Sequence, residues 1–140
     1  MTHLLDTSAI LAHYLDEPGA DQVCALLAGG RAVVALAAPS WPELARRLTE
    51  LIVDPVAAAR VHHSYTRDLC AFIPLDEPAT LAAMRIQQAC RTRLPLVDTL
   101  IAGCAAHANL ILVHRDPHLD AISPRQLRML RLPDKFRDRA

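Results

Sequence analysis

The sequence predicts a single α/β domain in which helices cover a mainly parallel central sheet. Short apolar runs alternate along the chain with longer segments of helical character, which is the pattern of such a fold. The composition agrees, because 52% of the 140 residues are apolar and only 4% are aromatic. The core is therefore expected to consist of Leu, Ala, Val and Ile, which suits helices packed on a sheet.

Four short apolar runs are the expected strands. They are residues 3–5, 32–36, 72–75 and 110–113. Helical segments separate them, and strands joined through helices pair in parallel. The expected helices lie at 8–15 and 21–27, and then after Ser40, Asp54, Glu77 and Pro95. The last of these, VDTLIAGCAAHA, consists of small residues that allow close packing on the sheet.

The charge and cysteine content exclude some broad classes. Fifteen basic residues balance fifteen acidic ones, so a site for a polyanion has to be a local patch. The four cysteines stand singly, without a C-x-x-C pair, which favours reduced thiols over zinc. No apolar run approaches the ~20 residues of a membrane helix, and no export signal opens the chain. We therefore expect a cytoplasmic protein with no membrane segment.

Four acidic residues are placed where a parallel sheet gathers its ligands, at the carboxyl ends of the strands. Asp6 follows the first strand, and Glu43 lies in the helix after the second. Asp98 starts a late helix, and Asp116 comes three residues after the run 110–113. All four side chains are thus expected to face one crevice.

Three of these acids also have structural explanations. Ser40-Trp41-Pro42-Glu43 fits the capping box, in which the Glu carboxylate bonds back to the helix N-terminus. Asp98 fits the N-cap of its helix, and Asp116 before Pro117 fits a turn or a cap. Asp6 is the hardest to explain in this way, because a charge at the end of a buried strand needs a hydrogen bond, an ion pair or a metal.

Carboxylates held within a few Å of one another repel unless a cation neutralises them. Oxygen ligands of this kind suit Mg²⁺ or Mn²⁺, which keep several waters and commonly bridge carboxylates to substrate phosphates. Such an ion orients a water for attack on phosphorus and stabilises the leaving oxygen. The acids therefore predict phosphodiester hydrolysis.

Three stretches of the sequence resemble one enzyme family. LLDTSAIL, PSWPEL and LPLVDTLIAGCAAHANLILVHRDPHLDAI together resemble the PIN-domain ribonucleases, and most closely the VapC-type toxins of toxin-antitoxin modules. The resemblance runs from Asp6 to about Ile122. It implies a three-layer α/β/α fold for a single PIN-like domain over residues 1–132, with a polar tail at 133–140.

The resemblance also implies roles for particular residues. Asp6, Glu43, Asp98 and Asp116 would be the catalytic acids, with metal bound by the three aspartates. Other candidates for contact with substrate are Thr7, Arg115 and His118. The family often has a hydroxyl residue two positions before the last Asp and sometimes an acid two positions after it, whereas this chain has His114 and His118. Asp120 lies close enough in sequence to compensate.

Function and partners follow from the same resemblance. The chain would be a Mg²⁺- or Mn²⁺-dependent endoribonuclease toxin that cuts single-stranded or looped RNA, forms a homodimer and is inhibited by a small antitoxin protein. Two alternatives stay open. One is a housekeeping PIN nuclease of RNA maturation or decay. The other is a PIN-like binding subunit that has lost catalysis, and the two histidines at positions where the family has other residues are the reason to consider it.

Overall fold

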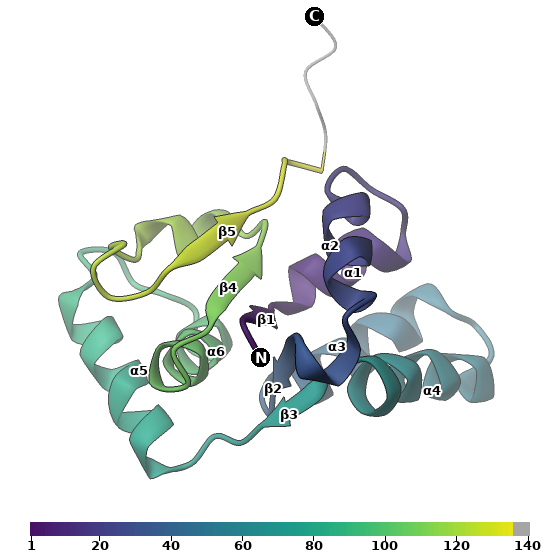
Figure 1. The fold of residues 1–140 in the computed structure, drawn as a ribbon, viewed down its shortest axis with the longest axis horizontal. Helices are drawn as coiled ribbons and strands as arrows, with labels where there is room; N and C mark the ends of the chain where they lie inside the picture. Colours follow the sequence, from purple (N-terminus) through teal and green to yellow (C-terminus); the bar gives the residue numbers. More distant parts are fainter. Residues whose placement is uncertain (136–140) are drawn as a thin grey trace, which may run out of the picture.

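A parallel sheet forms the centre of the computed structural model, which describes residues 1–135. Within these residues the sheet has five strands in the order β3-β2-β1-β4-β5, and every neighbouring pair is parallel (Figure 1). The strands are β1 His3–Leu5, β2 Val34–Ala37, β3 Ala71–Ile73, β4 Ile111–His114 and β5 Met129–Arg131. The predicted α/β class with a parallel sheet is confirmed.

The four predicted strands all form, with bounds shifted by one or two residues, but the sequence analysis missed β5. This edge strand has only three residues, and Leu130 and Arg131 are exposed, so it lacks the apolar run that marks the other strands. Its register is set by β4, where Val113 lies opposite Leu130 and His114 opposite Arg131. Tertiary pairing, more than local sequence, makes this segment a strand.

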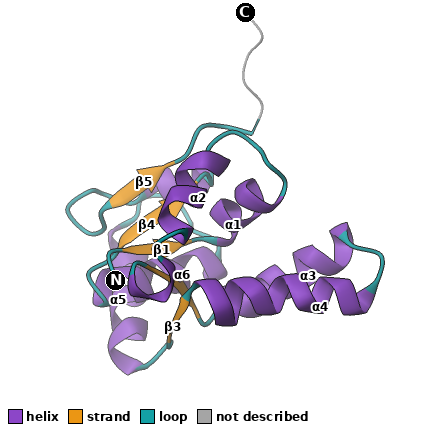
Figure 2. Cartoon of the chain, turned by 45° about the vertical axis from the view of Figure 1, so that its right-hand side comes forward, coloured by secondary structure: helices purple, strands orange, loops and turns teal. Residues whose placement is uncertain are grey.

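Six α-helices cover the two faces of the sheet within the described chain (Figure 2). They are α1 Thr7–Tyr14, α2 Ala20–Leu27, α3 Ser40–Leu51, α4 Pro55–His63, α5 Glu77–Ala89 and α6 Leu96–His107. A π-helical turn at Ser64–Leu69 and short 3₁₀ turns at Gly30–Ala32 and Pro117–Ala121 complete the connections. None of the helices among residues 1–135 is both long and apolar enough to cross a membrane.

The side chains of the strands alternate between two hydrophobic cores. Leu5 and Leu36 belong to the core shared with α1, α2, α3 and α4. Their neighbours Leu4 and Ala35 belong to the core shared with α5 and α6. This period of two buries both faces of the sheet, which gives the three layers α/β/α that were expected.

Close contact between α5 and α6 depends on a glycine. A Cβ added at Gly103 would lie 2.6 Å from the carbonyl oxygen of Ala79 and 2.6 Å from the Cβ of Ala83. The backbones of the two helices therefore touch at this point, as the small-residue composition of the segment predicts. The contact fixes α6, which carries Asp98 in its first turn.

The end of the described chain is tied to the domain. Leu132 is buried, Asp134 pairs with Arg131 at 2.9 Å, and Lys135 pairs with Glu17 at 3.5 Å. The polar tail predicted at 133–140 thus begins with two residues that form ion pairs, and residues 136–140 lie outside the described part of the chain.

Candidate active site and metal centre

The four predicted acids line one cavity at the carboxyl edge of the sheet. Asp6 directly follows β1, Asp116 comes two residues after β4, and Glu43 and Asp98 lie in the first turns of α3 and α6. The cavity has a volume of about 190 Å³. Its lining consists of these four acids with Thr7, Ser8, Leu11, Arg46 and Arg47. Residues from four separate segments of the chain are therefore brought together, as strand order and crossover geometry require.

Asp6 has the least favourable surroundings for a charge. Its side chain is 2% exposed, and only one of its two oxygens is paired within the protein. The Oδ2 atom accepts bonds from the Ser8 backbone N–H at 3.2 Å and from the Ser8 hydroxyl at 2.6 Å, whereas Oδ1 has no partner. Burial raises the pKa of Asp6 to about 6, against the hydrogen bonds from Ser8, and the charges of Glu43 and Asp116 add to the rise.

Ser8 links two of the loops that carry the acids. Its hydroxyl donates to Asp6 and accepts a bond from the backbone N–H of Arg115 at 3.1 Å. The end of β1 is thereby tied to the segment that carries Asp116. The sequence analysis missed Ser8, although a hydroxyl two residues after an Asp at a helix N-terminus is the usual signature of such a turn.

Asp98 is the most strongly perturbed acid of the cavity. It is the third residue of α6, and Pro95 occupies the N-cap position, so the structure does not support the N-cap explanation. The side chain is buried. Burial raises the pKa of Asp98 to about 8, and the negative charges of Asp116, Asp6 and Glu43 raise it further. The neighbouring carboxylates thus disfavour ionisation of Asp98.

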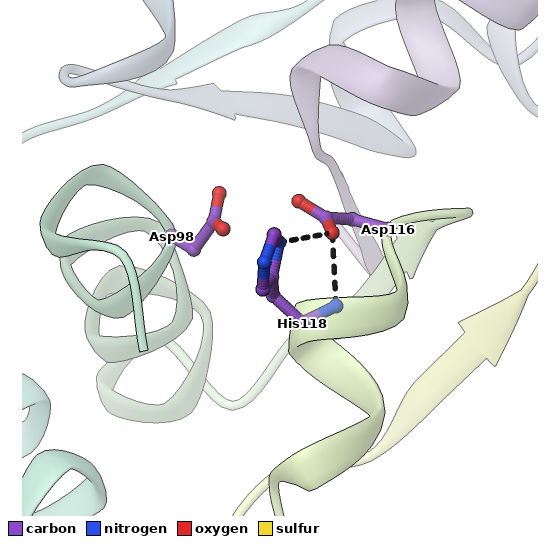
Figure 3. Close-up of side chains that lie close together, drawn as sticks. All are labelled: Asp98, Asp116 and His118. Carbon is purple, nitrogen blue, oxygen red and sulfur yellow. Dashed lines mark hydrogen bonds and ion pairs between the residues drawn. The ribbon is translucent and has the colours of Figure 1, made fainter. Parts of the chain in front are cut away.

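Asp116 combines a capping role with a place in the cavity. It caps the 3₁₀ turn Pro117–Ala121, because its Oδ1 accepts the backbone N–H of His118 at 2.9 Å. The Nδ1 atom of the same histidine lies 3.0 Å from this oxygen (Figure 3). Asp98, Asp116 and His118 each offer one ligand atom, and the three atoms lie within 4.8 Å of one another. This trio is the candidate core of a metal site.

Glu43 is not engaged in the capping box that its sequence suggested. The N-cap of α3 is Pro39, which makes no side-chain capping bond, and Ser40 lies inside the helix with a buried hydroxyl that has no partner. Arg46 and Arg47 follow Glu43 by three and four residues and therefore share its face of the helix. Their guanidinium groups lie 3.5 and 2.9 Å from Glu50, at the exposed side of the cavity.

The remaining predicted contact residues differ in position. Thr7 lines the cavity, and its buried hydroxyl has no partner. Arg115 does not line the cavity, since its guanidinium pairs with Glu17 at 2.6 Å and both side chains are largely buried.

His114 stands where the family often has a hydroxyl residue, and Asp120 was expected to compensate for the departure from the family pattern. Both have structural partners. His114 is 1% exposed, and its Nδ1 accepts the backbone N–H of Asp116 at 3.1 Å. Burial lowers the pKa of His114, and the bond from the Asp116 N–H to its Nδ1 supports the Asp116 loop. Asp120 pairs with Arg131 at 3.0 Å on the surface.

The donor set of the cavity fits a divalent cation. Carboxylates supply most of the donors, and one buried carboxylate oxygen, Asp6 Oδ1, has no hydrogen-bond partner in the protein. Such an atom costs free energy unless a ligand satisfies it. A divalent ion would both satisfy Asp6 and remove the repulsion that raises the pKa values of Asp6 and Asp98.

The model of the PIN domain family matches residues 3–123, and the chain belongs to this family. Solved structures are similar over nearly the full length. The DNA-bound VapBC complex of Salmonella typhimurium has a chain with a TM-score of 0.76 and 17% identity, covering 94% of this chain and 98% of that chain.

Two further complexes extend the comparison. For VapBC2 of Rickettsia felis, bound to a promoter DNA fragment, the TM-score is 0.75 with 14% identity, and 95% and 100% of the two chains are covered. For FitAcB of Neisseria gonorrhoeae the TM-score is 0.68 with 22% identity, and 91% of this chain and 96% of that chain are covered. At such identities the likeness concerns the fold. No curated protein matches the sequence significantly.

Proposed function

We propose that the protein is a metal-dependent endoribonuclease of the VapC type, which hydrolyses phosphodiester bonds in single-stranded or looped RNA. The observation that carries the proposal is Asp6, a buried carboxylate with one unpaired oxygen in a cavity shared with Glu43, Asp98 and Asp116. Buried polar atoms usually have a hydrogen-bond partner, so this oxygen is a candidate to bind a ligand. The PIN family membership supports a nuclease in particular.

The residues of the cavity divide the work of hydrolysis. Asp6, Asp98 and Asp116 would hold Mg²⁺ or Mn²⁺, and such an ion would supply activation of a water and stabilisation of charge on the leaving oxygen. Glu43 lies in the first turn of α3 and lines the same cavity, where its carboxylate would accept a proton from the attacking water. Ser8 fixes the orientation of Asp6, and thereby one side of the metal site.

The contacts with RNA are assigned to the basic residues of α3. Arg46 and Arg47 lie at the exposed side of the cavity, where a guanidinium can bind a phosphate in a bidentate manner. Thr7 remains a candidate for a hydrogen bond to substrate, because its hydroxyl lines the cavity and has no partner. Arg115 is instead assigned a structural role, because its ion pair with Glu17 anchors the loop that carries Asp116.

We further propose that a small antitoxin protein inhibits the enzyme and that the chain forms a homodimer in the cytoplasm. The similar solved structures are toxin-antitoxin complexes, which supports the first part of this proposal. Most apolar residues of α1 and α2 are in the core, including Ile10 and Val23, and so cannot form a surface groove for the antitoxin. Apolar side chains that are exposed near the cavity are Leu96 and Val97 at the start of α6.

Induced expression in cells tests the toxin role. Wild-type protein is expected to arrest growth and to leave discrete RNA fragments, while Asp98→Asn does neither. Asp76→Asn is the matched control, because Asp76 caps α5 as Asp6 and Asp116 cap the helical segments that follow them, but it lies outside the cavity. RNA cleavage without growth arrest would favour the housekeeping nuclease. Metal binding without any cleavage would favour the binding subunit.

A further inference from the structure

We infer that His118 supplies a nitrogen ligand to the metal ion of the cavity and that this ligand makes the site prefer Mn²⁺ to Mg²⁺. The inference rests on the proposed function only in so far as a divalent ion binds among the acids. The inference concerns which of the two ions binds. The residue that decides this is His118, which lies two positions after Asp116, where the family pattern sometimes has an acid.

The position of His118 already matches that of a ligand. Its ring extends between the carboxylates of Asp98 and Asp116 (Figure 3), and ligand atoms of all three residues lie within 4.8 Å of one another. The Nδ1 atom lies 3.0 Å from Asp116 Oδ1 in a hydrogen bond, which the two atoms would exchange for a shared ion. Neighbouring ligands of an octahedral ion with bonds of about 2.1 Å lie about 3.0 Å apart, so the spacing suits binding of one ion by both atoms.

The local backbone holds the ring at this place. The N–H of His118 donates to Asp116 Oδ1 at 2.9 Å, which fixes the first turn of the 3₁₀ segment and with it the start of the side chain. The side chain itself is 62% exposed, so no core packing prevents the small ring rotation that ligation requires.

A second, independent feature points to a cation at this cavity. Asp6 is 2% exposed, its Oδ1 has no protein partner, and it lines the cavity together with Asp98 and Asp116. His118 itself is not among the residues that line the cavity, and it is joined to Asp6 through Asp98 and Asp116, which belong both to the cavity lining and to the ligand trio. The site therefore consists of carboxylates from three segments and one imidazole.

The imidazole decides the selectivity. Mg²⁺ prefers oxygen ligands and keeps its waters, whereas first-row transition ions bind imidazole more strongly. Other nearby side chains fit this role less well. Asp120 is paired with Arg131, and His114 does not belong to the ligand trio of the described residues, although its Nε2 is buried without a partner while its Nδ1 accepts the N–H of Asp116. Replacement of His118 by an acid converts the site into an oxygen-only site, which should favour Mg²⁺.

The test is a metal-binding experiment on the purified full-length chain. Metal-free wild type, His118→Asp and His118→Gln are titrated with Mn²⁺ and with Mg²⁺ by calorimetry, and pulsed electron paramagnetic resonance of the Mn²⁺-loaded proteins detects coupling to an imidazole nitrogen. His63→Gln is the matched control. His63 is 66% exposed and lies 3.7 Å from a carboxylate of Asp68, yet it is far from the cavity in sequence and does not belong to the ligand trio.

The expected result is Mn²⁺ affinity at least tenfold above Mg²⁺ affinity in wild type and in His63→Gln, with coupling to one imidazole. In His118→Asp the coupling disappears and the ratio falls by about tenfold or more. Mn²⁺ binding without imidazole coupling, an unchanged ratio in His118→Asp, or no Mn²⁺ binding at all would overturn the inference. An inactive protein that still shows coupling through His118 would instead contradict the ribonuclease proposal alone.

Discussion

Neutralising Asp6 should stabilise the metal-free protein, although Asp6 belongs to the proposed active site. Its pKa is raised from 3.8 to about 6, chiefly by burial. A difference of about two pH units corresponds to about 3 kcal/mol. Between pH 4 and pH 6 the folded protein therefore binds more protons than the unfolded chain, so its stability falls as the pH rises through this window, and the full penalty is present above it.

The variant Asp6→Asn removes this penalty and keeps an amide oxygen that can accept the bonds from Ser8. The new amide group needs an acceptor of its own, and the bonds from Ser8 lose their charge-assisted part. We therefore expect a net gain of about 1 to 2 kcal/mol in the free energy of unfolding at pH 7.5, and little or no gain at pH 4.

Urea denaturation of the metal-free proteins at pH 4 and pH 7.5 measures this difference, with Asp76→Asn as the control for removal of one carboxylate outside the cavity. Addition of Mg²⁺ should stabilise wild type and leave Asp6→Asn nearly unchanged. The reasoning would be refuted if Asp6→Asn were less stable than wild type at pH 7.5 and the loss of stability were the same at pH 4.

Three further variants test the supports of the cavity. Ser8→Ala removes both hydrogen bonds of the Ser8 hydroxyl. It should lower the rate of RNA cleavage by about 10- to 100-fold at saturating metal. Normal activity would show that the link to Arg115 is dispensable. The double change Arg46→Gln with Arg47→Gln should weaken RNA binding and reduce the slope of log K against log salt concentration by roughly 1.4. An unchanged slope would exclude phosphate contacts by these two arginines. Gly103→Ala forces α5 and α6 apart and should cost about 2 kcal/mol or more in urea denaturation, whereas a variant as stable as wild type would contradict the contact.

Much of the fold was predictable because each face of the sheet imposes a regular pattern on the sequence. The alternation of Leu4 and Leu5 between two cores, and the small residues around Gly103, express burial directly. The strand β5 was missed because its pairing with β4 is decided by tertiary contacts, and its three residues contain no apolar run.

The cavity was predictable to the extent that strand ends converge. Parallel crossovers placed Asp6, Glu43, Asp98 and Asp116 together from sequence alone. The hydrogen-bond partners of individual side chains were not predictable, because they depend on the relative placement of distant segments. Thus Arg115 is paired with Glu17, 98 residues away in the chain.

The central claim is that the acids of the cavity hold a divalent ion that cleaves RNA. The most direct measurement is cleavage of an end-labelled single-stranded RNA by purified wild type and Asp98→Asn, in EDTA, in Mg²⁺ and in Mn²⁺. We predict that the wild type and the control Asp76→Asn cleave only with an added ion, and that Asp98→Asn does not cleave under any of these conditions. Equal cleavage in EDTA, or equal cleavage by Asp98→Asn, would contradict the account.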